Sequence, residues 1–411
     1  MMKGTCDSPG LMPIERAMQL IMDTITPFSE VSNCHIDEAL DRVIAQDIIS
    51  PINVPAYDNS AMDGYALRYA DFVTTKTLVQ VGKSFAGNNF EGVMGQGQCV
   101  RIMTGAQIPD GADTVVMQEN TTANENQITF IEASQGDAIR PAGDDIQKGA
   151  IVLHVGARIS PIDIGLLASL GIANIPVYRR LKVAVFSTGD ELLAVGSPPR
   201  EDRIFDTNRP MLVAMLSRLG AEVMDLGIIV DDKEKIRAAF EYANKHADCV
   251  VTSGGVSVGE ADYTREILEE YGTIDFWKLA IKPGKPLAFG RLSDSIFFGL
   301  PGNPVSSAVT FDQIAAPALR YLAGCNVSTP QFLPAIAVTP FKKRPGRTDY
   351  QRANYFVNDQ GKIGVATTGS QSSGVLSCFR QSNCYVVLEN QRGNVAEGES
   401  VQILPFTNLI A

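Results

Sequence analysis

The chain has 411 residues, of which 45% are hydrophobic and 20% charged, and its formal net charge is −11. This composition predicts about two to four domains with hydrophobic cores, and the acidic balance argues against nucleic acid or an anionic membrane as the main partner. The N-terminal residues contain no apolar segment of the signal-peptide kind, and no uncharged apolar run is long enough to cross a bilayer, so a cytoplasmic protein is expected. The seven cysteines include no Cys-x-x-Cys pair and no Cys/His cluster, which argues against a disulfide framework and a structural zinc site.

Residues 1–180 are expected to form an N-terminal region with a β-rich domain inserted at about residues 50–145. The region begins with an amphipathic pattern that predicts a helix over Ile14–Thr24. Residues 36–49 show helical spacing but end in β-branched residues, so both a helix and a strand remain open there. In the inserted part, Gly, Pro and Asn separate short apolar runs. The expected elements are strands at residues 78–81, 99–103, 114–117, 128–130 and 149–154, and a helix at 161–170.

Residues 181–326 alternate apolar runs with helical patterns, which predicts an α/β domain with a doubly wound, mostly parallel sheet. Three apolar runs, residues 181–186, 248–253 and 295–300, each lead into a loop rich in Gly or polar residues. If these strands are parallel neighbours, their loops meet at the sheet edge where open α/β sheets bind ligands. The remaining expected elements are a helix that begins at Thr207 and stops at Gly220, a strand at 223–230, a helix to Lys245 capped by Asp231 and Asp232, and a helix at 263–271.

Residues 327–411 are expected to form a C-terminal β domain, most simply a small barrel. The strands predicted there span residues 335–338, 363–367, 384–389 and 400–404, with Gly and Asn turns between them.

Glycine-rich turns at the expected sheet edge can bind an oxyanion, because their backbone N–H groups are accessible at the start of a helix. A single turn of this kind is more often a tight connection, but three at one edge favour a ligand cleft. The residues concerned are Thr188, Gly189, Gly254, Gly255, Ser257, Pro301, Gly302, Asn303 and Pro304.

Residues 255–259 also match the G-x-S-x-G nucleophile elbow of α/β-hydrolases. That fold needs its catalytic His after the Ser, whereas the three histidines, His35, His154 and His246, all precede Ser257. Ser257 is therefore expected to be a ligand-contacting hydroxyl rather than a nucleophile.

Acidic and basic residues surround the same edge. The carboxylates are Asp190, Glu191, Asp231 and Asp262. Several carboxylates beside a phosphate repel one another unless a hard cation lies between them, which predicts Mg²⁺. Taken singly, each could be a helix cap or a turn residue. Lys278 and Lys282 could face the cleft together, although surface lysines are usually only solvated.

A second polar cluster lies in the β-rich part. Asp58, Ser60 and Asp63 fall within six residues, and Thr104 ends a predicted strand. Spacing alone favours turns and caps for these residues.

Four segments of the α/β domain resemble the molybdopterin-binding domain of molybdenum cofactor biosynthesis proteins. They are residues 186–192 (FSTGDEL), 253–262 (SGGVSVGEAD), 277–286 (WKLAIKPGKP) and 299–304 (GLPGNP). This domain is also similar to molybdopterin adenylyltransferases, which consist of little else. Residues 58–66 (DNSAMDGYA) and 101–106 (RIMTGA), together with the C-terminal segment, resemble instead the molybdenum-inserting molybdopterin molybdenumtransferase family, which is related to the C-terminal domain of gephyrin.

The resemblance implies that adenylylated molybdopterin and molybdate react, with Mg²⁺, to give molybdenum cofactor and AMP. It implies a homodimer in which the β-rich domain of one subunit completes the α/β site of the other, with the molybdopterin adenylyltransferase as a candidate partner. The implied catalytic residues are Asp58, Thr104, Glu191, Asp231 and Asp262, of which Glu191, Asp231 and Asp262 bind Mg²⁺. The implied substrate-binding residues are Ser60, Asp63, Thr188, Gly189, Asp190, Gly254, Gly255, Ser257, Lys278, Lys282, Pro301, Gly302, Asn303 and Pro304. Candidate molybdate ligands are Lys282, Arg352 and Ser373, the last two of which could equally be ordinary loop residues.

Two other functions remain open from the sequence. One is adenylyl transfer to molybdopterin. The other is a non-catalytic scaffold, since a related domain fused to other modules anchors receptors in animals.

Overall fold

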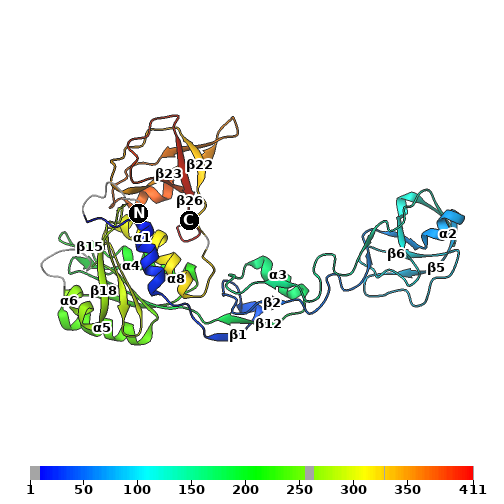
Figure 1. Ribbon diagram of the computed structural model, residues 1–411, viewed down its shortest axis with the longest axis horizontal. Helices are drawn as coiled ribbons and strands as arrows, with labels where there is room; N and C mark the ends of the chain where they lie inside the picture. The colour runs from blue at the N-terminus through cyan, green and yellow to red at the C-terminus, as the bar shows by residue number, and fades with distance from the viewer. Residues whose placement is uncertain (1–9, 255–262, 328, 411) are drawn as a thin grey trace, which may run out of the picture. The chain divides into compact units, whose positions relative to one another are not determined.

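The computed structural model describes residues 10–254, 263–327 and 329–410, and it divides into two compact units (Figure 1). Unit 1 comprises Met1–Ser32, Asp41–Val43 and Tyr178–Ala411, and unit 2 comprises Asn33–Leu40 and Ile44–Val177. Within the described ranges, no helix has the length and apolar character that a membrane span requires.

Unit 1 contains a six-stranded sheet with the strand order β16-β13-β17-β21-β20-β18. The first four strands are mutually parallel, and β20 and β18 are antiparallel to their neighbours, so the predicted doubly wound, mostly parallel sheet is confirmed. The strands are β13 (Lys182–Thr188), β16 (Glu222–Ile229), β17 (Cys249–Ser253), β18 (Gly272–Lys278), β20 (Pro286–Leu292) and β21 (Ile296–Leu300). The register aligns Val183 with Cys249 and Cys249 with Ile296, so the loops after β13, β17 and β21 leave the same edge, as predicted.

Helices cover both faces of this sheet, because side chains alternate between the faces along each strand. In β13, Val183 and Val185 belong to one apolar cluster, whereas Ala184 and Phe186 belong to the other. Figure 1 shows α5 and α6 on one side of the sheet and α1 with α8 on the other. The helices of unit 1 are α1 (Ile14–Thr24), α4 (Asn208–Leu219), α5 (Lys233–His246), α6 (Tyr263–Tyr271), α7 (Pro304–Thr310) and α8 (Ala316–Leu322), with a π-helical turn η3 (Phe311–Ala315) between the last two.

Two predicted helix caps need correction. Helix α4 ends at Gly220, whose φ of +92° is the left-handed conformation expected there, but Thr207 makes no capping hydrogen bond. Asp206 accepts the backbone N–H of Arg209 instead. Helix α5 is capped by Asp232, which accepts the N–H of Lys235 at 3.0 Å, so Asp231 is not needed as a cap.

The C-terminal part of unit 1 is a small closed barrel. Strands pair in the order β23-β24-β22-β26-β25, and β25 pairs again with β23. The strands are β22 (Leu333–Ala337), β23 (Thr348–Val357), β24 (Ile363–Thr367), β25 (Cys384–Leu388) and β26 (Ser400–Pro405), with the short helix η4 (Leu376–Gln381). The sequence did not predict β23, which also pairs with β19 (Ile281–Lys282) and so joins the barrel to the α/β layer. The two layers share an apolar core that contains Tyr350 and Tyr385.

Unit 2 contains a six-stranded sheet with the order β7-β4-β6-β5-β9-β8. Its strands are β4 (Gly64–Leu67), β5 (Thr77–Ser84), β6 (Gln98–Ile102), β7 (Thr114–Met117), β8 (Thr121–Asn124) and β9 (Gln127–Phe130). Four strand pairs complete the chain: β1 (Val31–His35) with β12 (Asn174–Tyr178), β2 (Ile48–Ile49) with β11 (Ile151–Leu153), β3 (Asn59–Ser60) with β10 (Ile139–Arg140), and β14 (Leu192–Leu193) with β15 (Ile204–Phe205). The remaining helices are α2 (Tyr69–Thr74), α3 (Pro161–Ser169), η1 (Ile36–Glu38) and η2 (Gln118–Asn120).

A helix over residues 36–49 is the wrong alternative. Only η1 is helical there, and the β-branched end forms β2. Ile44 and Ile48 are buried in a cluster with Ile175 and Val177, so tertiary packing, rather than the apparent helical spacing, decides the conformation.

Candidate functional site

The sheet-edge loops of unit 1 are tied together by Asn208, the first residue of α4. Its Nδ2 donates to the Ser253 hydroxyl and to the Gly302 carbonyl, each at 2.7 Å. Ser253 ends β17, and Gly302 follows β21. One amide therefore fixes two of the three predicted ligand loops relative to each other.

The third loop is supported by Asp206. This buried carboxylate accepts from the Ser187 hydroxyl at 3.1 Å and from Arg209 Nε at 2.8 Å. Ser187 is the second-last residue of β13 and lies next to the predicted ligand residue Thr188. Sequence reasoning missed both Asp206 and Asn208. The signal available was the segment 206–210 (DTNRP), where the helix cap was assigned to Thr207 alone.

Gly189 and Gly254 are required at this edge. A Cβ at Gly189, where φ is +143°, would lie 2.7 Å from Cδ and Oε1 of Glu191. A Cβ at Gly254, where φ is +93°, would lie 2.9 Å from the carbonyl oxygen of Thr188. The first observation shows that the Glu191 carboxylate folds back over Gly189, and the second that the loops after β13 and β17 approach each other through their backbones.

Three predicted carboxylates cluster beside these loops. The backbone N–H of Asp231 donates to Asp190 Oδ1 at 3.2 Å. The pKa of Asp231 is raised, first by partial burial and then by the negative charges of Asp190 and Glu191. Clustered carboxylate oxygens are donors that suit Mg²⁺. However, the described residues contain no group of three or more His, Cys, Asp or Glu arranged as a metal site. Asp262 lies outside the described residues, as do Gly255 and Ser257, so the metal site stays a prediction.

The loop after β21 meets the C-terminal barrel. Asn303 occupies the cap position of α7 and makes no side-chain capping bond. The N–H of Val305 donates to the Ser373 carbonyl at 3.1 Å, which places Ser373 at the start of α7 beside the 301–304 segment. Two predictions from distant parts of the sequence, the Pro301–Pro304 turn and Ser373, are thus brought together.

Lys282 lies in a strongly basic pocket of about 560 Å³. Its lining residues are Lys282, Lys342, Lys343, Arg344, Arg347, Asp349 and Asn394. Lys282 Nζ is 3.0 Å from Asp349, the single carboxylate among them. Burial lowers the pKa of Lys343, whose Nζ donates only to backbone carbonyls. Lys278 is exposed at the end of β18, outside this pocket. The cation excess makes the pocket suited to an oxyanion, and sequence reasoning missed Arg347.

Arg352, the other cation implied for molybdate, is 1% exposed. Its guanidinium donates to the carbonyls of Ser372 at 3.2 Å and Ser370 at 3.5 Å and to Cys378 Sγ at 3.3 Å. In this arrangement Arg352 holds the loop that carries Ser373, whereas Arg347 of the same strand region lines the basic pocket.

The polar cluster of unit 2 is compact. Asp63 Oδ1 accepts both the N–H and the hydroxyl of Thr104, each at 2.8 Å. These hydrogen bonds, the backbone one first, lower the pKa of Asp63. The Ser60 carbonyl accepts the N–H of Gly105 at 2.8 Å, and Asp58 accepts the N–H of Ala142 at 2.7 Å. Asp63, Thr104 and Ser60 are therefore held close together, and Asp58 is fixed separately through Ala142.

Comparison with known proteins assigns each part of this architecture. Residues 184–321 match the family model described as a probable molybdopterin binding domain. Residues 12–171 and 334–406 match the MoeA N-terminal region (domain I and II) and the MoeA C-terminal region (domain IV). The fold and its ligand edge thus define a molybdopterin-binding protein of the MoeA type.

Sequence similarity over nearly the full chain identifies the family within this class of molybdopterin-binding proteins. The chain is 48% identical to a molybdopterin molybdenumtransferase of Haemophilus influenzae over 97% of this chain and 100% of that protein. It is 32% identical to gephyrin of Dictyostelium discoideum over 97% of this chain and 62% of that protein. A solved molybdopterin biosynthesis moeA protein from Pyrococcus horikoshii OT3 superposes with a TM-score of 0.84 at 28% identity, covering 96% of this chain and 100% of that one. The chain belongs to the molybdopterin molybdenumtransferase family, whose members are enzymes of molybdenum cofactor biosynthesis.

Proposed function

We propose that the enzyme inserts molybdenum from molybdate into adenylylated molybdopterin in a Mg²⁺-dependent reaction that releases AMP. The observation that carries this proposal is that the charges of Asp190 and Glu191 act on Asp231 at the sheet edge where Asn208 ties together the loops after β17 and β21. The pyrophosphate that joins the pterin to adenosine is the kind of anion that such loops bind through backbone N–H groups.

The acidic residues of the edge have distinct tasks in this reaction. Glu191, Asp231 and Asp262 would hold Mg²⁺, which supplies Lewis-acid polarisation of the pyrophosphate when bound. Thr188, Gly189 and Gly254 would contact the phosphates, and Gly302 with Asn303 would close the other side of the substrate. The pKa of Asp231 is raised first by burial and then by the negative charges of Asp190 and Glu191, and a bound cation would offset both effects, which supports this assignment.

Molybdate is proposed to bind near Lys282 and Ser373. The basic pocket around Lys282 supports a divalent oxyanion, since only Asp349 offsets its cations. Arg347 is the arginine whose position suits direct contact, and Arg352 would act by holding the loop that carries Ser373.

The remaining residues are proposed to act across a homodimer in the cytoplasm. Asp58, Ser60, Asp63 and Thr104 would serve the α/β site of a second copy. Their ordering within unit 2 supports a preformed surface that needs no rearrangement to meet a substrate. The enzyme that adenylylates molybdopterin is the candidate partner that supplies the substrate.

Two adjacent acids provide the test. Asp231→Asn is expected to lower kcat/KM for AMP release at least tenfold, about 1.4 kcal/mol, and to weaken Mg²⁺ binding measured by calorimetry. Asp232→Asn is the matched control, because Asn also caps helices and Asp232 only caps α5. Equal rates and equal Mg²⁺ affinities in the two variants would remove Asp231 from the metal site.

A separate experiment distinguishes molybdenum insertion from adenylyl transfer. Purified enzyme with molybdopterin and MgATP, but no molybdate, should form no adenylylated pterin. Adenylylated pterin in that mixture would show adenylyl transfer and would contradict the proposed reaction.

A further inference from the structure

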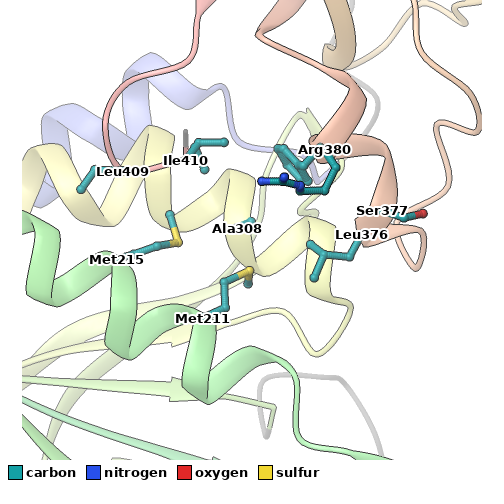
Figure 2. A pocket seen from close by; sticks show the side chains of 9 residues that line it. Met211, Met215, Ala308, Leu376, Ser377, Arg380, Leu409 and Ile410 are labelled. Carbon is teal, nitrogen blue, oxygen red and sulfur yellow. The ribbon is translucent and has the colours of Figure 1, made fainter.

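A cavity of about 310 Å³ opens between the α/β layer and the barrel of unit 1. Its walls come from segments that are far apart in the sequence. Figure 2 shows them as Met211 and Met215 of α4, Ala308 of α7, Leu376 of η4, and Leu409 with Ile410 near the C-terminal end. Apart from Ser377 and Arg380, the lining side chains are apolar.

The size of this cavity is that of a ligand site. Pockets that bind small molecules typically measure about 300–1,000 Å³, and this one lies at the lower end of that range. An apolar cavity of about 150 Å³ stays dry and binds benzene, so one of twice that volume can take a chain of about ten carbons or two fused rings. Met211 and Met215 can adapt to such a body, because the methionine side chain is flexible and polarisable.

One cation is placed at the mouth of the cavity. Arg380 is exposed, and Figure 2 shows it extending from η4 toward Ile410. Within the described part of the chain, its guanidinium makes no ion pair and no hydrogen bond. An unpaired guanidinium above an apolar cavity favours a ligand that carries one oxyanionic group on an apolar body.

We propose that this cavity binds a small amphipathic anion, namely an aliphatic or fused aromatic body with one carboxylate or sulfonate. The body would lie between Met215 and Leu376, and the anionic group would pair with Arg380. This site is separate from the molybdenum chemistry and does not rest on the proposed reaction. Its occupant would contact η4, which directly follows the loop that Arg352 holds.

Decanoate is the probe that tests whether the cavity selects a ligand with an anionic group. We expect saturable binding to the full-length protein with one site, measured by calorimetry and by displacement of anilinonaphthalene sulfonate fluorescence. Arg380→Ala should weaken decanoate at least tenfold, about 1.4 kcal/mol, and abolish the preference for decanoate over decanol. Arg200→Ala is the matched control, because Arg200 is an exposed arginine outside the cavity. Absence of saturable binding, or equal affinity of the wild type for decanoate and decanol, overturns the proposal.

The location is tested independently. Met215→Trp should fill the cavity and eliminate decanoate binding. The wild type labelled with ¹³C in its methionine methyl groups gives a second measurement that no folding defect can affect. Decanoate should shift the signals of Met211 and Met215 and leave that of Met94, which is buried in unit 2, in place. Binding without shifts at Met211 and Met215 places the ligand elsewhere and refutes the site.

Discussion

Asn208 offers the most direct test of how the ligand edge is held. The side chain is 8% exposed, and its Nδ2 makes two hydrogen bonds of 2.7 Å, to the Ser253 hydroxyl and to the Gly302 carbonyl. Asn208→Ala removes both donors and leaves no side chain to replace them. The loops after β17 and β21 then lose the bond that fixes their separation.

The expected cost follows from the two acceptors that remain. Leaving a buried polar group unsatisfied costs about 1–3 kcal/mol. Ser253 is 4% exposed, so its hydroxyl oxygen loses a donor in a buried position, whereas Gly302 is exposed and its carbonyl can accept from water instead. The free energy of unfolding of unit 1 should therefore fall by about 1–3 kcal/mol, a large share of the roughly 5–15 kcal/mol typical of a folded domain.

Urea unfolding measures this change in unit 1 specifically. Trp277 is the only tryptophan of the chain, and it packs on Phe289 within the α/β sheet, so its fluorescence reports on that unit. Thr207→Ala is the matched control. Thr207 is exposed and its hydroxyl contacts only the Phe205 carbonyl, at 3.2 Å, so the control should stay within about 0.5 kcal/mol of the wild type.

Asn208→Ala should also weaken substrate binding. The KM for adenylylated molybdopterin should rise in Asn208→Ala under conditions where both proteins are fully folded, because the phosphate loops are no longer held together. A variant that loses stability but keeps the wild-type KM would show that Asn208 supports the fold and not the ligand edge. A variant that is as stable as Thr207→Ala would refute the hydrogen-bond reasoning itself.

Further predictions concern a buried acid and a required glycine. Burial raises the pKa of Asp312, so the folded state keeps a proton that the unfolded state releases near 3.8. The free energy of unfolding should therefore fall as pH rises above that value and level off above the raised pKa. Asp312→Asn should remove this part of the pH dependence, and a stability difference that is constant with pH would contradict it. Gly189→Ala should displace the Glu191 carboxylate and weaken Mg²⁺ binding by calorimetry. Gly393→Ala, where a Cβ meets nothing within 4 Å, should leave Mg²⁺ binding unchanged, and equal affinities in the two variants would refute the steric argument.

The parallel core of the sheet could be predicted because its strands are continuous apolar runs. β13, β17 and β21 are buried on both faces apart from Lys182, and each contains an apolar run of at least three residues. Helix α1 was predicted to the residue, since one apolar face and a flanking proline define it. Such signals are local, and they suffice wherever burial is purely apolar.

Strand β23 could not be predicted, because three of its five buried residues are polar. Asp349, Gln351 and Arg352 are each at most 3% exposed. Each is satisfied by a partner that is distant in the sequence: Lys282 for Asp349, the Lys342 carbonyl for Gln351, and the loop at residues 370–372 for Arg352. A buried polar group needs such partners, but the sequence does not state where they are. The strand therefore looks like a polar loop until its contacts are known.

The same distinction between local signals and distant partners applies to the residues of the candidate site. Sequence patterns identified charged candidates, among them Glu191 and Lys282, because charge is visible in any sequence. They missed Asp206 and Asn208, which act through hydrogen bonds to other parts of the protein. Their only signal was a short capping segment whose polar residues have an adequate local explanation.

Two kinds of residue can be distinguished at the candidate site. Some have donors that already bond to the protein and so position the site, and others have charged groups that, in the part of the chain the structure describes, have no protein partner and can bind a ligand. Asn208 and Arg352 direct their donors to protein acceptors, so neither has its main bonding capacity free. Within the described residues, by contrast, the Glu191 carboxylate accepts no hydrogen bond and Arg347 has no ion-pair partner. Free negative charge at the sheet edge suits a cation bound with phosphates, and free positive charge in the basic pocket suits an oxyanion. The proposed reaction of an adenylylated pterin with molybdate needs both kinds of surface, and here Asn208 and Arg352, which bond to protein acceptors, support the loops beside them.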